Sequence, residues 1–220
     1  MKILALETAN EQCSVALVDD TQLLSFELNF EPRAQTQQIL PMIERALSQT
    51  ETTWQEISAI AFSRGPGSFS GVRINAAVAQ ALAWTHDLPV VPVSTLRALA
   101  QHAHQEADIK QVTAVIDARM NEVYVGSFSV DEHGIMQADD QEQLLGYEAA
   151  TDVVRHQVVG TGAKLVSDDV AENLHYANAQ DIAIIARVEF LQGNTVSAEH
   201  ALPVYLRDNA WKKIADQGKA

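Results

Sequence analysis

A glycine-rich segment, Ser63–Arg73, is the stretch whose residue types and spacing could most readily do chemistry. Its three glycines allow tight turns, and the helix expected directly after it offers unbonded amide groups that attract anions. Arg64 and Arg73 add positive charge at its two ends. The segment is interpreted as a cradle for a phosphate or carboxylate or, as the spacing alone favours, as a strand-to-helix turn capped by Ser68 or Ser70.

Spacing excludes two known catalytic loops at this segment. A phosphate-binding P-loop ends in Gly-Lys-Ser or Gly-Lys-Thr, whereas here Gly71 is followed by Val72 and Arg73. The nucleophile elbow of serine hydrolases places a serine midway between two glycines, but the residue midway between Gly67 and Gly71 is Phe69. The serines of the segment are therefore poor candidates for a catalytic nucleophile.

Two carboxylates, Glu7 and Asp117, occupy equivalent places in two similar stretches of the chain. In each stretch an apolar run ends near the acidic residue, a polar turn follows, and a second apolar run closes at Asp19 or Asp131. This internal repeat suggests either that Glu7 and Asp117 have a paired role across a cleft or that each merely caps its turn. The segment 160–162, Gly-Thr-Gly, could approach a nucleotide closely, but a plain turn is the simpler interpretation.

Strand-like and helix-like segments alternate along the chain, which predicts an α/β protein. We place a domain boundary near Asp108, which divides the chain into units 1–108 and 109–220. No low-complexity linker separates the two units, so they are expected to pack closely. The expected strands are 2–6, 14–18, 57–62, 90–93, 112–116, 123–130 and 158–159, the expected helices are 36–48, 69–85, 98–106 and 179–191, and 203–207 is a short extended piece.

Two of the expected helices are rich in apolar residues. The helix at 71–85 is apolar nearly all round, so it should be buried on more than one side. The helix at 36–48 has a broad apolar stripe, and Pro41 either kinks it or sets its first turn. Composition alone favours packing within the chain over packing against another subunit.

The seven histidines do not form a helical zinc site, because no two of them lie four residues apart. His102 and His104 fall in an expected helix and should be solvated on its surface.

Charge and composition limit the classes of partner. The formal net charge is −14, from 15 Lys+Arg and 29 Asp+Glu, so the chain should repel nucleic acid and anionic membranes and meet RNA only through a partner. The single cysteine, Cys13, cannot form an internal disulfide. The sequence offers neither a signal-peptide core nor a membrane-spanning run, and a cytoplasmic protein is expected.

Five short motifs follow one another along nearly the whole chain. They are Leu-Ala-Leu-Glu-Thr at 4–8, Ile-Leu-Pro-Met-Ile at 39–43, Gly-Pro-Gly-Ser-Phe-Ser-Gly-Val-Arg-Ile at 65–74, Asp-Ala-Arg at 117–119 and Pro-Val-Tyr-Leu-Arg at 203–207. Taken in this order, the motifs resemble the TsaB (YeaZ) family. The resemblance implies the actin-like, sugar-kinase-like fold of two related βα domains, in agreement with the internal repeat.

The resemblance also implies partners. In that family TsaD transfers a threonylcarbamoyl group to the tRNA adenosine beside the anticodon, TsaB binds and supports TsaD, and TsaE joins as an ATPase. Two helices of the N-terminal domain make the contacts in TsaB homodimers and in the TsaB–TsaD pair. The matching residues here are Leu40, Ile43, Leu47, Val72, Ala76, Ala77, Ala81 and Trp84, and the loop that shapes this neighbourhood, near a partner or an anion, contains Arg64, Gly65, Gly67, Ser68, Ser70 and Arg73.

The resemblance also argues against catalysis. TsaD relatives hold a metal through a His-x-x-x-His motif, and the matching positions here are Thr95 and Leu99, neither of which can replace imidazole. The segment 7–10, Glu-Thr-Ala-Asn, lacks the glycine that lets backbone approach phosphate. We therefore expect no metal, no catalytic residue and no cofactor, with nucleotide at most at a subunit boundary. The residues of a vestigial nucleotide cleft are Glu7, Thr8, Asp117, Gly160 and Gly162.

The sequence thus predicts a non-catalytic partner and scaffold of TsaD that contacts tRNA only through the complex. One alternative is an active ATP-dependent phosphotransferase of the same fold, with Glu7 or Asp117 as general base. A peptidase-like hydrolase is the other alternative, and the missing metal ligands and nucleophile elbow argue against it.

Overall fold

The first sheet contains five strands in the order β3-β2-β1-β4-β5. β1 pairs antiparallel with β2 and parallel with β4, and β4 pairs parallel with β5. In this computed structural model, which describes residues 1–31 and 33–207, the strands are β1 (Ile3–Glu7), β2 (Cys13–Val18), β3 (Leu23–Asn29), β4 (Ala59–Gly65) and β5 (Val90–Ser94).

Both faces of this sheet are covered by helices, which explains why its inner strands β1 and β2 are buried along their whole length. In β1, Leu4 and Leu6 pack with α1 (Gln35–Gln49) and α2 (Phe69–His86). Ile3 and Ala5 point to the opposite face and pack with α3 (Thr95–Ala107) and α5 (Ala179–Leu191). Pro41 lies inside α1 and not in its first turn.

The second sheet repeats the arrangement of the first. β6 pairs antiparallel with β7 and parallel with β10, as β1 does with β2 and β4. α4 (Tyr147–Val153) packs on the face opposite α3. The strands are β6 (Gln111–Arg119), β7 (Glu122–Val130), β8 (Met136–Ala138), β9 (Gln143–Gly146) and β10 (Gln157–Val159).

The internal repeat and the α/β class predicted from the sequence are therefore confirmed. The repeat extends to the turns, because Asp19 accepts a hydrogen bond from the N–H of Thr21, and Asp131 accepts one from the N–H of His133. We call the half of the molecule around each sheet a lobe. The segment 203–207 crosses from the lobe of the first sheet to the lobe of the second without forming a strand.

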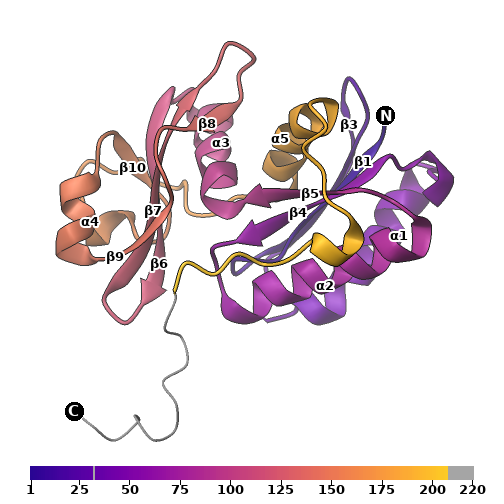
Figure 1. Cartoon of the computed structure of the whole chain (residues 1–220), viewed down its shortest axis with the longest axis horizontal. Coiled ribbons are helices and arrows are strands. Elements are labelled where there is room, and N and C mark those ends of the chain that lie inside the picture. The colour runs from indigo at the N-terminus through magenta and orange to yellow at the C-terminus, as the bar shows by residue number, and fades with distance from the viewer. Residues whose placement is uncertain (32, 208–220) are drawn as a thin grey trace, which may run out of the picture.

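Two helices, α3 and α5, stand between the two sheets (Figure 1). They share one hydrophobic core with strands of both sheets, as expected for units that pack closely. α3 precedes Asp108 but contacts β6, β7, β8 and β10, whereas α5 follows it but contacts all strands of the first sheet. The division into 1–108 and 109–220 stays a prediction. Each of these two helices contacts strands that lie on the other side of Asp108 in the sequence.

Side-chain caps define several helix starts. Ser68 caps α2, Ser94 caps α3, and Asn178 caps α5 together with Asp181 in a capping box. None of the helices formed by the described residues is long and apolar enough to cross a membrane.

Candidate functional site

The glycine-rich segment packs against the turn between β1 and β2. The Ser68 amide donates to the Ala9 carbonyl at 2.7 Å, and the Thr8 hydroxyl donates to the Gly71 carbonyl at 2.7 Å. A Cβ atom on Gly71 would lie 2.0 Å from the Thr8 carbonyl oxygen, and one on Gly67 would lie 2.4 Å from that of Ala9. The glycines are thus required by packing within the chain, which confirms the interpretation as a strand-to-helix turn.

Ser68, and not Ser70, is the cap of this turn, because its Oγ accepts from the Gly71 amide at 3.2 Å. Gly65 ends β4 with φ +100°, a conformation that glycine adopts most easily. Arg64 is half-buried, and its Nε has no hydrogen-bond partner among the described residues. The anion-cradle interpretation stays a prediction.

Glu7 and Asp117 cap their turns, as one of the two alternatives predicted. Glu7 accepts a hydrogen bond from the Ala9 amide, and Asp117 accepts one from the Arg119 amide at 2.8 Å. Asp117 also forms an ion pair with the Arg119 side chain at 3.0 Å. Each carboxylate therefore binds the amide two residues further along the chain.

The two carboxylates differ in burial. Glu7 is fully buried, and its Oε2 atom has no hydrogen-bond partner within the described part of the chain. Burial raises the pKa of Glu7 to about 7, and the Asp181 carboxylate adds to the rise, while hydrogen bonds from Ser63 and Ala9 oppose it.

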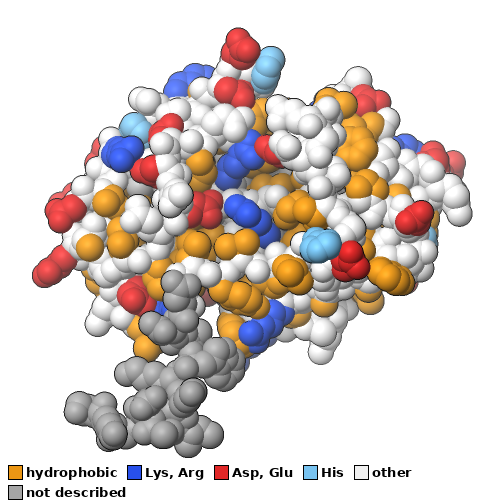
Figure 2. Space-filling view, viewed as in Figure 1, with side chains coloured by type: hydrophobic (Ala, Val, Ile, Leu, Met, Phe, Trp, Pro, Cys, Tyr) orange, Lys and Arg blue, Asp and Glu red, His pale blue; other side chains and the backbone are white. Residues whose placement is uncertain are grey.

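A cleft of about 1110 Å³ lies between the lobes, and Asp117 is on its wall. Figure 2 shows hydrophobic and basic side chains gathered along the border between the lobes. Thr95 and Leu99, the predicted substitutes for metal ligands, also line the cleft. Among residues 1–31 and 33–207, no group of three or more His, Cys, Asp or Glu side chains is arranged to hold a metal ion.

The structure separates the residues of the predicted nucleotide cleft. Glu7 and Thr8 are fully buried beside the first hairpin and are not among the described residues that line the cleft. Asp117 lines the cleft. The segment 160–162 forms a turn, as expected, in which the Gly162 amide donates to the Val115 carbonyl at 3.0 Å. Gly160 has φ +105°, close to the φ of Gly65 at the equivalent place in the first repeat.

Sequence reasoning named Arg73 but missed the two aromatic rings and the second arginine that accompany it at the mouth of this cleft. The Arg73 guanidinium lies 3.4 Å from the centre of the Phe69 ring, and its Nε donates to the Tyr205 hydroxyl at 3.0 Å. From the other end of the segment 203–207, Arg207 forms an ion pair with Glu122 on β7 at 2.6 Å. The only available signal was the Pro-Val-Tyr-Leu-Arg motif, whose position across the lobes depends on the tertiary fold.

One side of α2 is exposed. Arg73, Ala77, Ala81 and Trp84, which we call the α2 stripe, follow helical spacing and are all exposed, Trp84 to 74%. Leu40 on the neighbouring helix α1 is 49% exposed. The rest of α2 packs against β4, α1 and the short 3-10 helix Ala198–His200, so the expectation that this helix is buried on more than one side is confirmed, with the α2 stripe left exposed. Figure 2 shows hydrophobic atoms on the surface over α2.

The remaining residues of the predicted partner-binding set are buried under this surface. Ile43 and Leu47 of α1 and Ala76 of α2 pack into the core on the first sheet, and Val72 is also buried. These side chains therefore lie beneath the exposed residues and are not accessible on the surface of the single chain.

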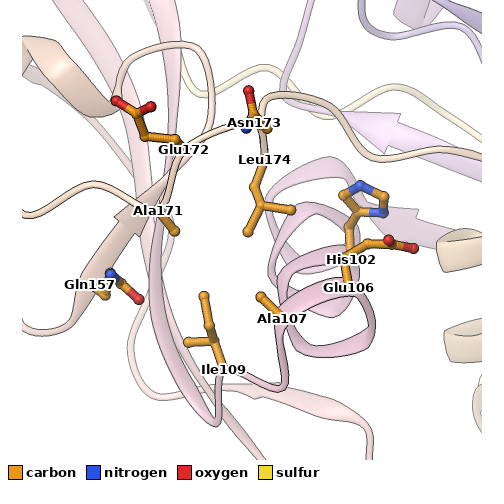
Figure 3. Close-up of a pocket in the computed structure, with 9 residues that line it drawn as sticks. All are labelled: His102, Glu106, Ala107, Ile109, Gln157, Ala171, Glu172, Asn173 and Leu174. Atoms are coloured by element: carbon orange, nitrogen blue, oxygen red, sulfur yellow. The ribbon is translucent and has the colours of Figure 1, made fainter.

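A second hollow, of about 680 Å³, lies beside α3, apart from every predicted site residue. Figure 3 shows His102 and Glu106 on α3 and Asn173 and Leu174 on the facing loop. His102 pairs with the buried Asp181 of α5 at 3.2 Å, and that carboxylate raises the pKa of His102 against the effect of burial. The side chains of His102 and His104 are only 17% and 14% exposed, so the expectation that they are solvated is wrong.

Three comparisons with known proteins agree with this geometry. The model of the TsaD family, tRNA N6-adenosine threonylcarbamoyltransferase, matches residues 31–143. The tRNA threonylcarbamoyladenosine biosynthesis protein TsaB of Escherichia coli (strain K12) is 42% identical over 97% of this chain and 98% of its own length. The solved structure of YeaZ from Pseudomonas aeruginosa has a TM-score of 0.85 at 34% identity and covers 93% of this chain and 99% of its own.

Two related sheets that share core helices define an α/β protein of two repeated halves, with the fold of YeaZ. The chain belongs to the TsaB family, which is related to the TsaD transferases.

Proposed function

We propose that this chain acts in the biosynthesis of threonylcarbamoyladenosine in tRNA, as a non-catalytic partner and scaffold of a TsaD-type transferase in the cytoplasm. The names of the TsaB relatives and the match to the TsaD family support the pathway. A TsaE-type ATPase is the proposed third component, and tRNA is contacted through the complex because the chain carries a net charge of −14.

The observation that carries the proposal is the exposed apolar surface of α2 and α1. Ala77, Ala81, Trp84 and Leu40 lie over a well-packed core, so the surface is rigid before a partner arrives. Small side chains on a helix let a second helix approach closely, and an exposed tryptophan is typical of residues that dominate binding energy. We propose that a helical face of the TsaD-type protein occupies this surface.

The cleft supports a non-catalytic role. The side chains at the predicted metal positions, Thr95 and Leu99, are a hydroxyl and a hydrocarbon, which are unsuited to a divalent metal that TsaD relatives hold by imidazole. Glu7, one candidate general base, is enclosed by protein and does not reach the described cleft wall.

The test is a titration of the TsaD-type protein of the same organism with wild-type chain and with Ala77→Arg and Ala81→Arg. Each substitution places a long cation on the apolar surface, and we expect affinity to fall at least about tenfold. Ala149→Arg is the matched control, because Ala149 is an exposed alanine on α4 in the other lobe. Equal affinity of all three variants and wild type would place the interface elsewhere.

Self-association is measured in parallel by analytical ultracentrifugation. If the two α2 variants lose self-association but still bind the TsaD-type protein, the surface serves a homodimer and the proposed occupant is wrong. A tRNA-modification assay with purified components separates helper from enzyme, since the chain alone should modify no tRNA and should stimulate the TsaD-type protein.

A further inference from the structure

We propose that Arg73 is a specificity-determining residue of the docking surface, which binds a carboxylate of the TsaD-type partner. This inference rests on the proposed function and deepens it, because it adds a charged contact to a surface that is otherwise apolar. The chemical class of the ligand is an aspartate or glutamate side chain of the partner protein.

The guanidinium of Arg73 is held in place before any partner binds. It lies over the Phe69 ring, 3.4 Å from the ring centre. It also lies 5.6 Å from the centre of the Tyr205 ring. The Tyr205 hydroxyl accepts the Nε hydrogen bond at 3.0 Å. Nε is therefore used for positioning, while the two Nη groups can donate a pair of parallel hydrogen bonds to a carboxylate.

Neighbouring arginines differ from Arg73 in their partners. Arg119 pairs with Asp117 and Arg207 pairs with Glu122, both close to the same cleft mouth. Arg73 is exposed, yet no carboxylate of residues 1–31 or 33–207 forms an ion pair with it. Within residues 1–31 and 33–207, Arg73 is therefore a positioned cation at the cleft mouth without an acidic partner.

The position of Arg73 explains why a partner would supply the missing carboxylate. Arg73 precedes Ala77 by one helical turn on the α2 stripe, so a helix that packs on Ala77 and Ala81 reaches it without rearrangement. It also lies near the amino-terminal end of α2, where the helix dipole adds positive potential. A single carboxylate there is favoured by the guanidinium and the helix dipole, whereas tRNA is a polyanion that the whole chain, with its net charge of −14, would repel.

The experiment measures affinity of the full chain for the TsaD-type protein at low and high salt. Arg73→Gln should weaken binding about tenfold at low salt and make the affinity less dependent on salt. Arg73→Lys should recover only part of the loss, because an ammonium cannot form the paired contact. Tyr205→Phe, which keeps the ring and removes the acceptor, should weaken binding about two- to threefold through loss of positioning.

Arg155→Gln is the matched control, since Arg155 is an exposed arginine of the other lobe that pairs with Asp140. A further variant, Arg73→Glu, should be rescued by one aspartate- or glutamate-to-lysine change in the partner. Rescue would identify the carboxylate and support the inference directly.

The outcomes separate this inference from the proposed function. If Ala77→Arg abolishes binding while Arg73→Gln and Tyr205→Phe bind like wild type with the same salt dependence, the Arg73 inference is wrong and the docking surface stands. If Arg73→Gln instead weakens tRNA binding by the complex without changing affinity for the TsaD-type protein, the ligand is phosphate and the inference is also wrong. If wild type does not bind the TsaD-type protein, the proposed function fails, and this inference fails with it.

Discussion

The two halves of the molecule share the same hairpin, parallel strand and turn, but the carboxylates at their hairpin ends lie in opposite environments. Glu7 is fully buried and Asp117 lines the cleft, although both accept the amide hydrogen two residues further on. The repeat therefore preserves the local capping interaction and not the environment. What a carboxylate can do in this fold is decided by what covers the turn.

The difference arises from the start of α5, which covers the first hairpin. The Asn10 side chain donates to the Ala177 carbonyl at 2.9 Å, and the Ala179 amide donates to the Ser14 hydroxyl at 2.9 Å. At the equivalent place in the second half, the hairpin faces the cleft and Asp117 pairs with the exposed Arg119. The first half is consequently closed to ligands at this point, and the second half forms the cleft wall.

The largest expected effect compares Gly160 with Gly65. Both glycines have φ near +100°, but a Cβ on Gly160 would lie 2.2 Å from the Val115 carbonyl oxygen, whereas one on Gly65 would lie 3.1 Å from that of Val204. Gly160→Ala should lose about 3–5 kcal/mol of unfolding free energy from strain and overlap together, and Gly65→Ala about 1–2 kcal/mol from strain. Urea denaturation measures both, and equal losses would break the comparison.

The second prediction concerns the pH dependence of stability. The pKa of Glu7 is about 7 in the folded chain and near 4.5 without burial, so between these values the folded chain binds the extra proton. The free energy of unfolding should therefore fall as pH rises from about 4.5 to about 7, by at most about 1.4 kcal/mol per pH unit from this group. Glu7→Gln keeps the acceptor for the Ala9 amide and removes this contribution.

The measurement is urea denaturation of wild type and Glu7→Gln across this pH range. The variant should gain stability relative to wild type as pH rises. Asp117→Asn is the matched control, since it changes the equivalent carboxylate on the cleft wall. Parallel stability curves for wild type and Glu7→Gln would show that burial does not distinguish the two hairpins.

The smallest effect concerns Thr161, whose hydroxyl accepts the Asp117 amide hydrogen at 3.1 Å. Pro66 stands at the equivalent place in the first half and has no such hydroxyl. Thr161→Ala should lose about 1 kcal/mol of unfolding free energy, and Thr161→Ser should recover most of it. Thermal or urea denaturation measures the pair, and identical stability of the two variants would contradict a role for the hydroxyl.

Several features could be predicted from the sequence because they depend on residues close together in the chain. The helix Ala179–Leu191 has the predicted bounds, and Ser68 was one of two predicted caps of α2. The repeat was visible because both hairpins have the same order of apolar run, polar turn and apolar run, and each turn is capped by a carboxylate that binds an amide only two residues away. The glycine turn was recognised for the same reason.

Only the tertiary structure decided which residues are accessible. The composition of α2 does not reveal that Ala76 faces the sheet while Ala77 faces solvent, because both are alanines and the helix is apolar nearly all round. It also could not place Tyr205 beside Arg73, since that contact joins residues far apart in the chain. The sequence by itself thus determined most of the strands, helices and turns, which arise from local hydrogen bonding and periodicity, whereas β3, β8, β9 and α4 were not predicted. Burial and the docking surface depend on how distant segments pack, and that is decided by the folded chain as a whole.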